Sequence, residues 1–204
     1  MSNLLLVVEG EGDVDATRLL MRRVLAQFFD RHDYKIHVHR RHDLCHLRAN
    51  DWANFKRYFN AAHAEECPII WLLDCDDGCA LDWLRNIYKV VAQLGLRQPL
   101  AFVFWVREYE AMFLYDLESI KEKLGIEEFH DIPADPQAKR GVKEWISSQL
   151  PSGFAYRESL DQERLTAVVD LEKIKTGYRS FEHLIKATEW ILQCEDSDIY
   201  PAAL

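Results

Sequence analysis

The sequence predicts an α/β protein built on a mainly parallel sheet that is flanked by helices. Continuous apolar runs at residues 4–8, 69–73 and 100–106 are typical of strands buried on both faces. Pro68 and Pro99 stand directly before the second and third of these runs and separate each run from the preceding helical stretch. The 204 residues are 49% hydrophobic and 29% charged, which is a globular composition in a chain long enough to bury a core.

In the stretches between these apolar runs, the apolar residues recur at the spacing of a helix. It predicts helices over 14–29, 51–64 and 80–94, the last ending at Gly95. Residues 35–40 alternate in polarity and predict a half-buried strand. A chain that alternates strand and helix with connections of this length forms βαβ units, so the strands are expected to run parallel.

The sequence predicts that the second half of the chain is mostly helical. Helices are expected over 108–124, 137–150, 161–174 and 180–194, with a loop over 129–136. We expect an α/β core over 1–125 and a helical C-terminal part over 126–204 that packs on it. The two parts together are expected to form one globular domain.

Composition narrows the classes of function. The net charge of −9, from 34 acidic residues against 25 Lys and Arg, argues against a module that grips DNA through a broad basic face. The apolar run at 4–8 is too short for a signal peptide, and no run approaches the roughly 20 residues that span a membrane. Five cysteines without a secretory context predict a reduced, cytoplasmic protein.

Carboxylates follow three of the predicted strands. The carboxyl ends of parallel strands meet at the edge of the sheet where ligands bind, so these groups are expected to gather there. Mutual repulsion becomes tolerable when a cation lies among them, and oxygen ligands favour Mg²⁺ or Mn²⁺. The alternative is that loops are simply polar and that Asp13 caps a helix. The candidate metal ligands are Glu9, Asp13, Asp74, Asp76, Glu108 and Glu110.

Two arrangements of these ligands remain open. Glu9, Asp74 and Asp76 are expected to hold one ion, and Asp13 with either Glu108 or Glu110 to hold a second ion or orient its water. Glu9 is alternatively a general base in a scheme with a single metal.

The same residues resemble a known fold. Glu9-Gly10 after the first strand and Asp74-Cys75-Asp76 after a later one are similar to the Mg²⁺-binding Toprim domain of topoisomerases, primases and the overcoming-lysogenization-defect nucleases. The stretches at 107–114 (REYEAMFL) and 179–184 (RSFEHL) resemble a Toprim-like bacterial family, domain-of-unknown-function family 4276. This second resemblance extends over essentially the whole chain.

The resemblance implies a Toprim-like Rossmannoid core and metal-dependent phosphotransfer with Mg²⁺ or Mn²⁺. It also implies the nuclease branch, a role in anti-phage defence and an AAA-type or ABC-type ATPase partner. Nucleases of the overcoming-lysogenization-defect type use a lysine from a helical insertion, for which Lys139 or Lys143 would stand here.

Phosphoryl transfer also needs cations to meet developing charge. Lys139 and Arg179 join Glu9, Asp74 and Asp76 as the predicted catalytic set. Arg107 is a further candidate for such a cation. The alternative is that Arg107 forms an ion pair that only fixes its loop. For Lys143 and Lys186 we favour a solvated surface charge.

Residues 31–48 reverse the charge of the chain locally, with five Lys or Arg, five His and two acids. This stretch predicts a nucleic-acid contact, with a solvated strand edge as the alternative. A zinc site of His42, Cys45 and His46 is a minor alternative. The predicted nucleic-acid-binding residues are Arg40, Arg41, Arg48 and Arg107.

The leading hypothesis is a divalent-metal-dependent nuclease. One alternative is a non-catalytic regulatory subunit that docks an ATPase, and another is a phosphatase or transferase acting on nucleotides. The sequence leaves the choice between DNA and RNA, and the oligomeric state, undetermined.

Overall fold

The computed structural model describes residues 2–41, 52–75 and 78–202. Its centre is a five-stranded sheet in which every neighbouring pair is parallel. The strand order is β2-β1-β3-β4-β5. The strands are β1 (Ser2–Val8), β2 (Tyr34–Arg40), β3 (Ile69–Asp74), β4 (Leu100–Trp105) and β5 (Ile199–Tyr200). The predicted α/β class and parallel sheet are therefore confirmed.

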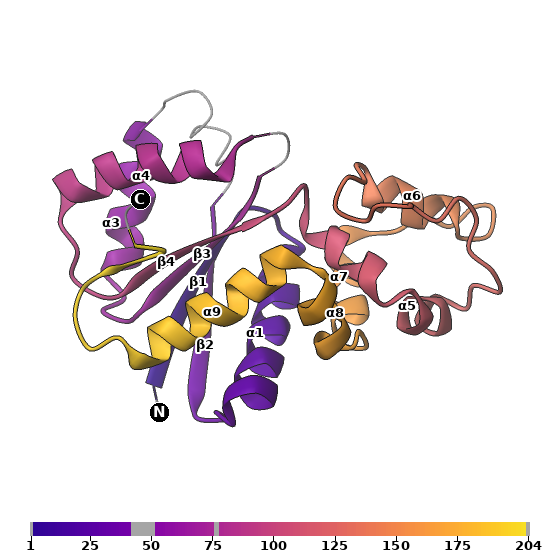
Figure 1. Cartoon of the computed structure of the whole chain (residues 1–204), viewed down its shortest axis with the longest axis horizontal. Coiled ribbons are helices and arrows are strands. Elements are labelled where there is room, and N and C mark those ends of the chain that lie inside the picture. The colour runs from indigo at the N-terminus through magenta and orange to yellow at the C-terminus, as the bar shows by residue number, and fades with distance from the viewer. Residues whose placement is uncertain (1, 42–51, 76–77, 203–204) are drawn as a thin grey trace.

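Helices cover both faces of this sheet (Figure 1). The helices are α1 (Asp13–Phe29), α3 (Trp52–His63), α4 (Ala80–Leu94), the 3₁₀ helix η1 (Tyr109–Tyr115), α5 (Leu117–Leu124), α6 (Val142–Ser148), α7 (Glu158–Thr166), α8 (Leu171–Gly177) and α9 (Arg179–Gln193). None of the helices in the described ranges is both long and apolar enough to cross a membrane.

Alternation along the strands creates two cores. In β3, Ile70 and Leu72 join the cluster formed with α1 and α9. Ile69, Trp71 and Leu73 face the other way and join the cluster formed with α3 and α4. Successive side chains of a strand point to opposite faces, so a continuous apolar run is what a sheet covered on both sides requires.

The second half of the chain is more broken than the sequence predicts. The helix expected over 108–124 divides at Asp116, whose carboxylate accepts hydrogen bonds from the backbone of Asp170 and from the side chain of Lys173. The helix expected over 137–150 begins only at Val142, after Gly141 in the left-handed conformation (φ 62°).

A further break lies in the segment expected to be helical over 161–174. It consists of the end of α7 and most of α8, because Asp170 caps α8 by accepting hydrogen bonds from the backbone N–H groups of Glu172 and Lys173. β5 was not predicted, since two residues carry no periodic signal.

The chain beyond residue 125 serves two different layers. α9 packs against β4, and β5 pairs with β4, so both belong to the sheet and its covering. α5, α6 and α7 instead form a lobe beside the end at which β4 finishes (Figure 1). This lobe lies next to the edge where the sequence predicts the acidic site.

Candidate metal centre

The loop after β1 is closed by one of the predicted ligands. Asp13 Oδ2 accepts a hydrogen bond of 2.7 Å from the backbone N–H of Gly10. The residue that caps α1 is Gly12, so Asp13 is the first residue of the helix and not its N-cap. A Cβ atom on Gly12 would lie 2.6 Å from Gln162 Oε1, so α7 packs directly on this loop.

Glu9 and Asp74 come together across the sheet. Glu9 Oε1 accepts a hydrogen bond of 3.2 Å from the backbone N–H of Asp74. β1 and β3 are neighbours in the sheet, which explains how residues 65 positions apart meet. Two of the three ligands predicted for the first metal ion are thus brought to one edge of the sheet.

The carboxyl group of Asp74 lies in a strongly anionic environment. Burial raises its pKa well above the usual value, and the negative charges of Asp13, Glu9 and Glu110 raise it further. Part of the residue is still accessible to solvent. Asp74 is therefore enclosed by protein and by other carboxylates while keeping an opening to the outside.

Glu110 is the fourth member of this cluster. Its side chain is 1% exposed, and Tyr156 donates a hydrogen bond of 2.9 Å to Glu110 Oε1. The other oxygen, Oε2, is buried and has no hydrogen-bond partner in the described part of the chain. Burial raises the pKa of Glu110 to about 8, even though Lys143 and Tyr156 act to lower it. We call Glu9, Asp13, Asp74 and Glu110 the acidic cluster.

Lys143 is a cation that the described part of the chain brings to the site. Its Nζ lies 2.6 Å from Glu158 Oε2 and 3.8 Å from Glu110 Oε1. Desolvation acts to lower its pKa, but the charges of Glu110, Glu158 and Asp74 hold it above the usual value. The sequence favoured a solvated surface charge for Lys143, and the structure instead gives it two carboxylate partners.

Three residues of the site were missed from the sequence. Gln162 in α7 donates a hydrogen bond of 2.8 Å to Asp13 Oδ1, and Tyr156 and Glu158 contact Glu110 and Lys143. They come from a segment about 150 residues beyond the first strand, and no spacing in the sequence relates them to it. Only the packing of α7 on α1 brings them to the site.

Other predicted site residues lie elsewhere. Glu108 Oε1 accepts a hydrogen bond of 2.7 Å from the backbone of Val142 and so caps the start of α6. Lys139 is half-buried in the loop before α6 and is not among the main charges acting on Asp74 or Glu110. Asp76, which the sequence assigned to the metal, lies outside the described residues.

Arg179 is exposed at the first turn of α9, where its charge acts on Glu182 and His183. Its neighbours secure the loop after β4. Ser180 Oγ accepts a hydrogen bond of 3.0 Å from the backbone of Val106. Ser180, which follows Arg179, therefore has a structural role. Lys186 pairs with Glu182 on the surface, as expected of a solvated charge.

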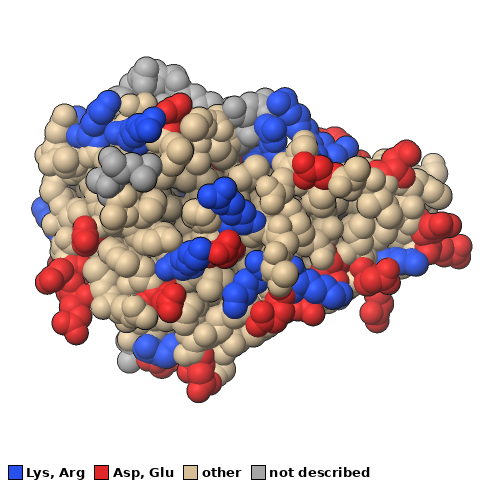
Figure 2. Space-filling view, viewed as in Figure 1, with Lys and Arg blue, Asp and Glu red and all other residues tan. Residues whose placement is uncertain are grey.

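The predicted nucleic-acid contacts are only partly described. Arg40 forms an ion pair of 3.0 Å with Glu11, and Arg41 lies over the ring of Tyr58. Arg107 has a left-handed backbone (φ 73°) in the loop after β4. Arg48 and the minor zinc alternative of His42, Cys45 and His46 lie outside the described residues. Acidic and basic side chains are interspersed over the face shown in Figure 2.

The acidic cluster has the donor chemistry of a hard-cation site. All four side chains carry carboxyl groups, and one buried oxygen of Glu110 lacks a hydrogen-bond partner in the described part of the chain. Burial keeps this group protonated up to a pKa of about 8, and a cation beside it would favour the charged form instead. Within residues 2–41, 52–75 and 78–202, no group of three or more His, Cys, Asp or Glu side chains is arranged so that it could hold a metal ion. The carboxyl groups are oxygen donors of the kind that Mg²⁺ and Mn²⁺ prefer, but the described side chains do not by themselves form a ligand group for such an ion.

Comparisons of this chain with protein-family models, with curated proteins and with solved structures returned no match. Its function is therefore inferred from the site itself.

Proposed function

We propose that this protein is a nuclease that hydrolyses phosphodiester bonds with the help of Mg²⁺ or Mn²⁺. The observation that carries the proposal is the buried, unpartnered oxygen of Glu110 within an anionic cluster at the carboxyl edge of a parallel sheet. Ligand sites of open parallel sheets lie at this edge. Carboxylates that raise one another's pKa are stabilised by a cation between them.

The residues divide into ligands and positioning groups. Glu9, Asp74 and Glu110 are the proposed ligands, together with Asp76 from the predicted Asp-x-Asp motif. Asp13 is a positioning residue, because its two oxygens already accept hydrogen bonds from Gly10 and Gln162. A bound divalent cation supplies Lewis-acid stabilisation of the phosphoryl oxygens and a nucleophilic water at neutral pH.

Of Lys139 and Lys143, the two residues that the resemblance offers for the lysine of a helical insertion, Lys143 takes this role. Its ammonium group lies against Glu110 and Glu158, where an entering phosphate meets a positive charge. Tyr156 holds Glu110 in place by donating to Oε1, which leaves Oε2 directed to a second partner.

The biological setting belongs to the same proposal. The resemblance to Toprim nucleases supports a cytoplasmic effector of anti-phage defence that works with an ATPase. It also supports nucleic acid over a small nucleotide as the substrate.

A second candidate is a non-catalytic subunit that keeps this fold to dock an ATPase. One observation favours it: Lys143 pairs with Glu158, and Tyr156 binds Glu110, so part of the cluster's charge is compensated within the protein. In this case the cluster binds a structural ion or none.

The test compares Asp74→Asn with Asp82→Asn. Asp82 is an exposed residue of α4 that pairs with Arg85, so its variant controls for the loss of one negative charge. The full chain is incubated with Mn²⁺ and plasmid DNA or transfer RNA, and its melting temperature is measured with and without the ion. We expect cleavage and a Mn²⁺-dependent rise in melting temperature in the wild type and Asp82→Asn, and neither in Asp74→Asn.

Equal stabilisation of both variants by Mn²⁺ would refute the metal site. A different result would favour the non-catalytic subunit. In that case Mn²⁺ stabilises the wild type but not Asp74→Asn, and the wild type cleaves neither substrate even when its proposed ATPase partner is present.

A further inference from the structure

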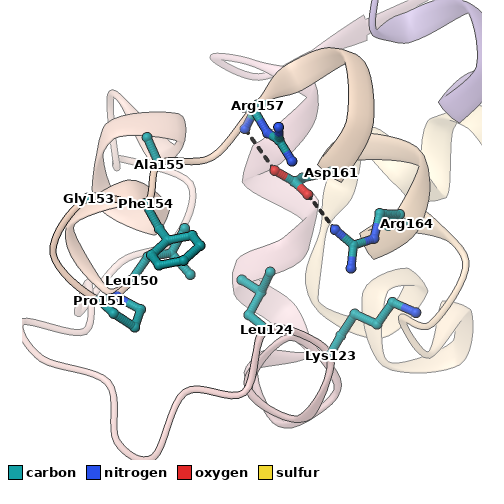
Figure 3. Close-up of a pocket in the computed structure, with 10 residues that line it drawn as sticks. All are labelled: Lys123, Leu124, Leu150, Pro151, Gly153, Phe154, Ala155, Arg157, Asp161 and Arg164. Atoms are coloured by element: carbon teal, nitrogen blue, oxygen red, sulfur yellow. Dashed lines mark hydrogen bonds and ion pairs between the residues drawn. The ribbon is translucent and has the colours of Figure 1, made fainter.

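A cavity of about 720 Å³ lies in the helical lobe, apart from the acidic cluster. Figure 3 shows its lining, which comes from the end of α5, the connection between α6 and α7, and α7 itself. Leu150 and Phe154 lie on one side of it, and Arg164 and Lys123 on the other. None of these residues belongs to the proposed metal centre.

The lining combines an exposed aromatic ring with cations. Phe154 is 71% exposed, which is unusual for a large apolar side chain. Lys123, Arg157 and Arg164 are exposed too, in a chain whose net charge is −9. The acid in the lining, Asp161, is buried and accepts hydrogen bonds of 2.9 Å from the backbone of Arg157 and from the side chain of Arg164. The cavity is therefore locally cationic and has an aromatic surface open to solvent.

One short segment forms a wall of both the cavity and the acidic site. Phe154 and Arg157 line the cavity. Tyr156, between them, is buried and donates to Glu110, and Glu158 binds Lys143. Residues that line the cavity are thus direct sequence neighbours of residues that contact Glu110 and Lys143.

We propose that this cavity binds an unpaired nucleic-acid strand and leads it to the acidic site. A base stacks on Phe154, while Lys123, Arg157 and Arg164 contact backbone phosphates. Proteins that bind single strands combine such stacking rings with a cationic path, whereas a duplex keeps its base faces covered. This inference rests on the proposed nuclease function and adds its substrate class, a single strand of DNA or RNA.

The experiment measures binding separately from cleavage. Fluorescence anisotropy of the full chain is recorded in EDTA with labelled oligothymidylate and oligouridylate of about 12 nucleotides. A duplex of the same length and an acidic peptide are the comparison ligands. Phe154→Ala is expected to weaken binding of the single strands about 5-fold to 150-fold, as the loss of one stacking contact does. Leu160→Ala, which removes an exposed apolar residue of α7 outside the cavity lining, is expected to bind normally.

A second variant tests the phosphate contacts. Lys123→Gln combined with Arg157→Gln should reduce the slope of log affinity against log salt by about 0.7 for each lost contact. Lys89→Gln, an exposed residue of α4, should leave the slope unchanged. Melting curves of all variants show whether each is folded. The relative affinity for the two oligonucleotides distinguishes DNA from RNA.

The inference is overturned if neither oligonucleotide binds at low salt, if the cavity variants bind as the wild type does, or if the duplex or the acidic peptide binds more tightly. Binding that Phe154→Ala weakens, in a protein that cleaves nothing with Mn²⁺, supports the cavity and refutes the nuclease. Cleavage by the wild type, with cavity variants that bind as the wild type does, supports the nuclease and refutes the cavity.

Discussion

The carboxyl group of Glu110 is enclosed by protein, and burial raises its pKa to about 8 from its usual value of 4.5. Between these two values the unfolded chain has lost a proton that the folded protein keeps. Folding therefore becomes less favourable as the pH rises from about 4.5 to about 8, because the folded state binds more protons there.

Glu110→Gln removes this titration while preserving the shape of the side chain. In EDTA, we expect the free energy of unfolding of the wild type to fall more steeply from about pH 5 to about pH 8 than that of the variant, by at least about 1 kcal/mol over the range. Urea unfolding at several pH values measures this difference. Asp74 and Asp13 titrate in both proteins, so their contribution to the pH dependence is shared. If the plots of the free energy of unfolding against pH were parallel for the two proteins, the pH dependence could not be assigned to Glu110.

At the scale of elements, the contact between α1 and α7 holds the site together. The guanidinium group of Arg23 in α1 donates hydrogen bonds to the backbone carbonyls of Thr166 and Val169, the second at 2.8 Å. These carbonyls lie at the end of α7 and just beyond it, where the helix leaves them without partners of its own. Arg23 therefore fixes the helix that carries Glu158 and Gln162.

Arg23→Gln is expected to lower the free energy of unfolding by about 1.5–3 kcal/mol, the usual contribution of hydrogen bonds to a charged group. The neighbouring Arg22 is exposed, so Arg22→Gln should change it by less than about 0.5 kcal/mol. Urea unfolding measures both. Similar losses in the two variants would show that charge, and not the contact with α7, matters.

At the scale of the whole molecule, the sheet depends on residues from both ends of the chain. Phe181, Leu184 and Ile191 of α9 are buried in the same core as β1 and α1, and β5 pairs with β4. Without them, the part of this sheet face that α1 does not cover and the edge of β4 would be left open.

A fragment ending at residue 125 is therefore expected not to fold cooperatively, although it contains four of the five strands. Thermal melting followed by circular dichroism, with sedimentation to detect aggregates, tests this expectation against the full chain. A sharp melting transition of the monomeric fragment would show that the first 125 residues form an independent domain.

The sequence by itself determined the parallel sheet and the edge at which the acids gather. Both follow from local patterns: buried runs identify strands, and a carboxylate after a strand must lie near the strand's carboxyl end. Glu9 and Asp74 were found in this way, and the hydrogen bond between them agrees with the prediction. The predicted role of these residues in binding a metal stays a prediction.

Only the tertiary structure decided which groups from the helical half complete the site. Glu108 and Glu110 are two residues apart, yet one caps α6 and the other enters the acidic cluster. Lys143 reaches the cluster, whereas Lys139 stays in the preceding loop. Such choices depend on how α6 and α7 pack against the end of the sheet. That packing is set by contacts between residues far apart in the chain, which leave no periodic signal in the sequence.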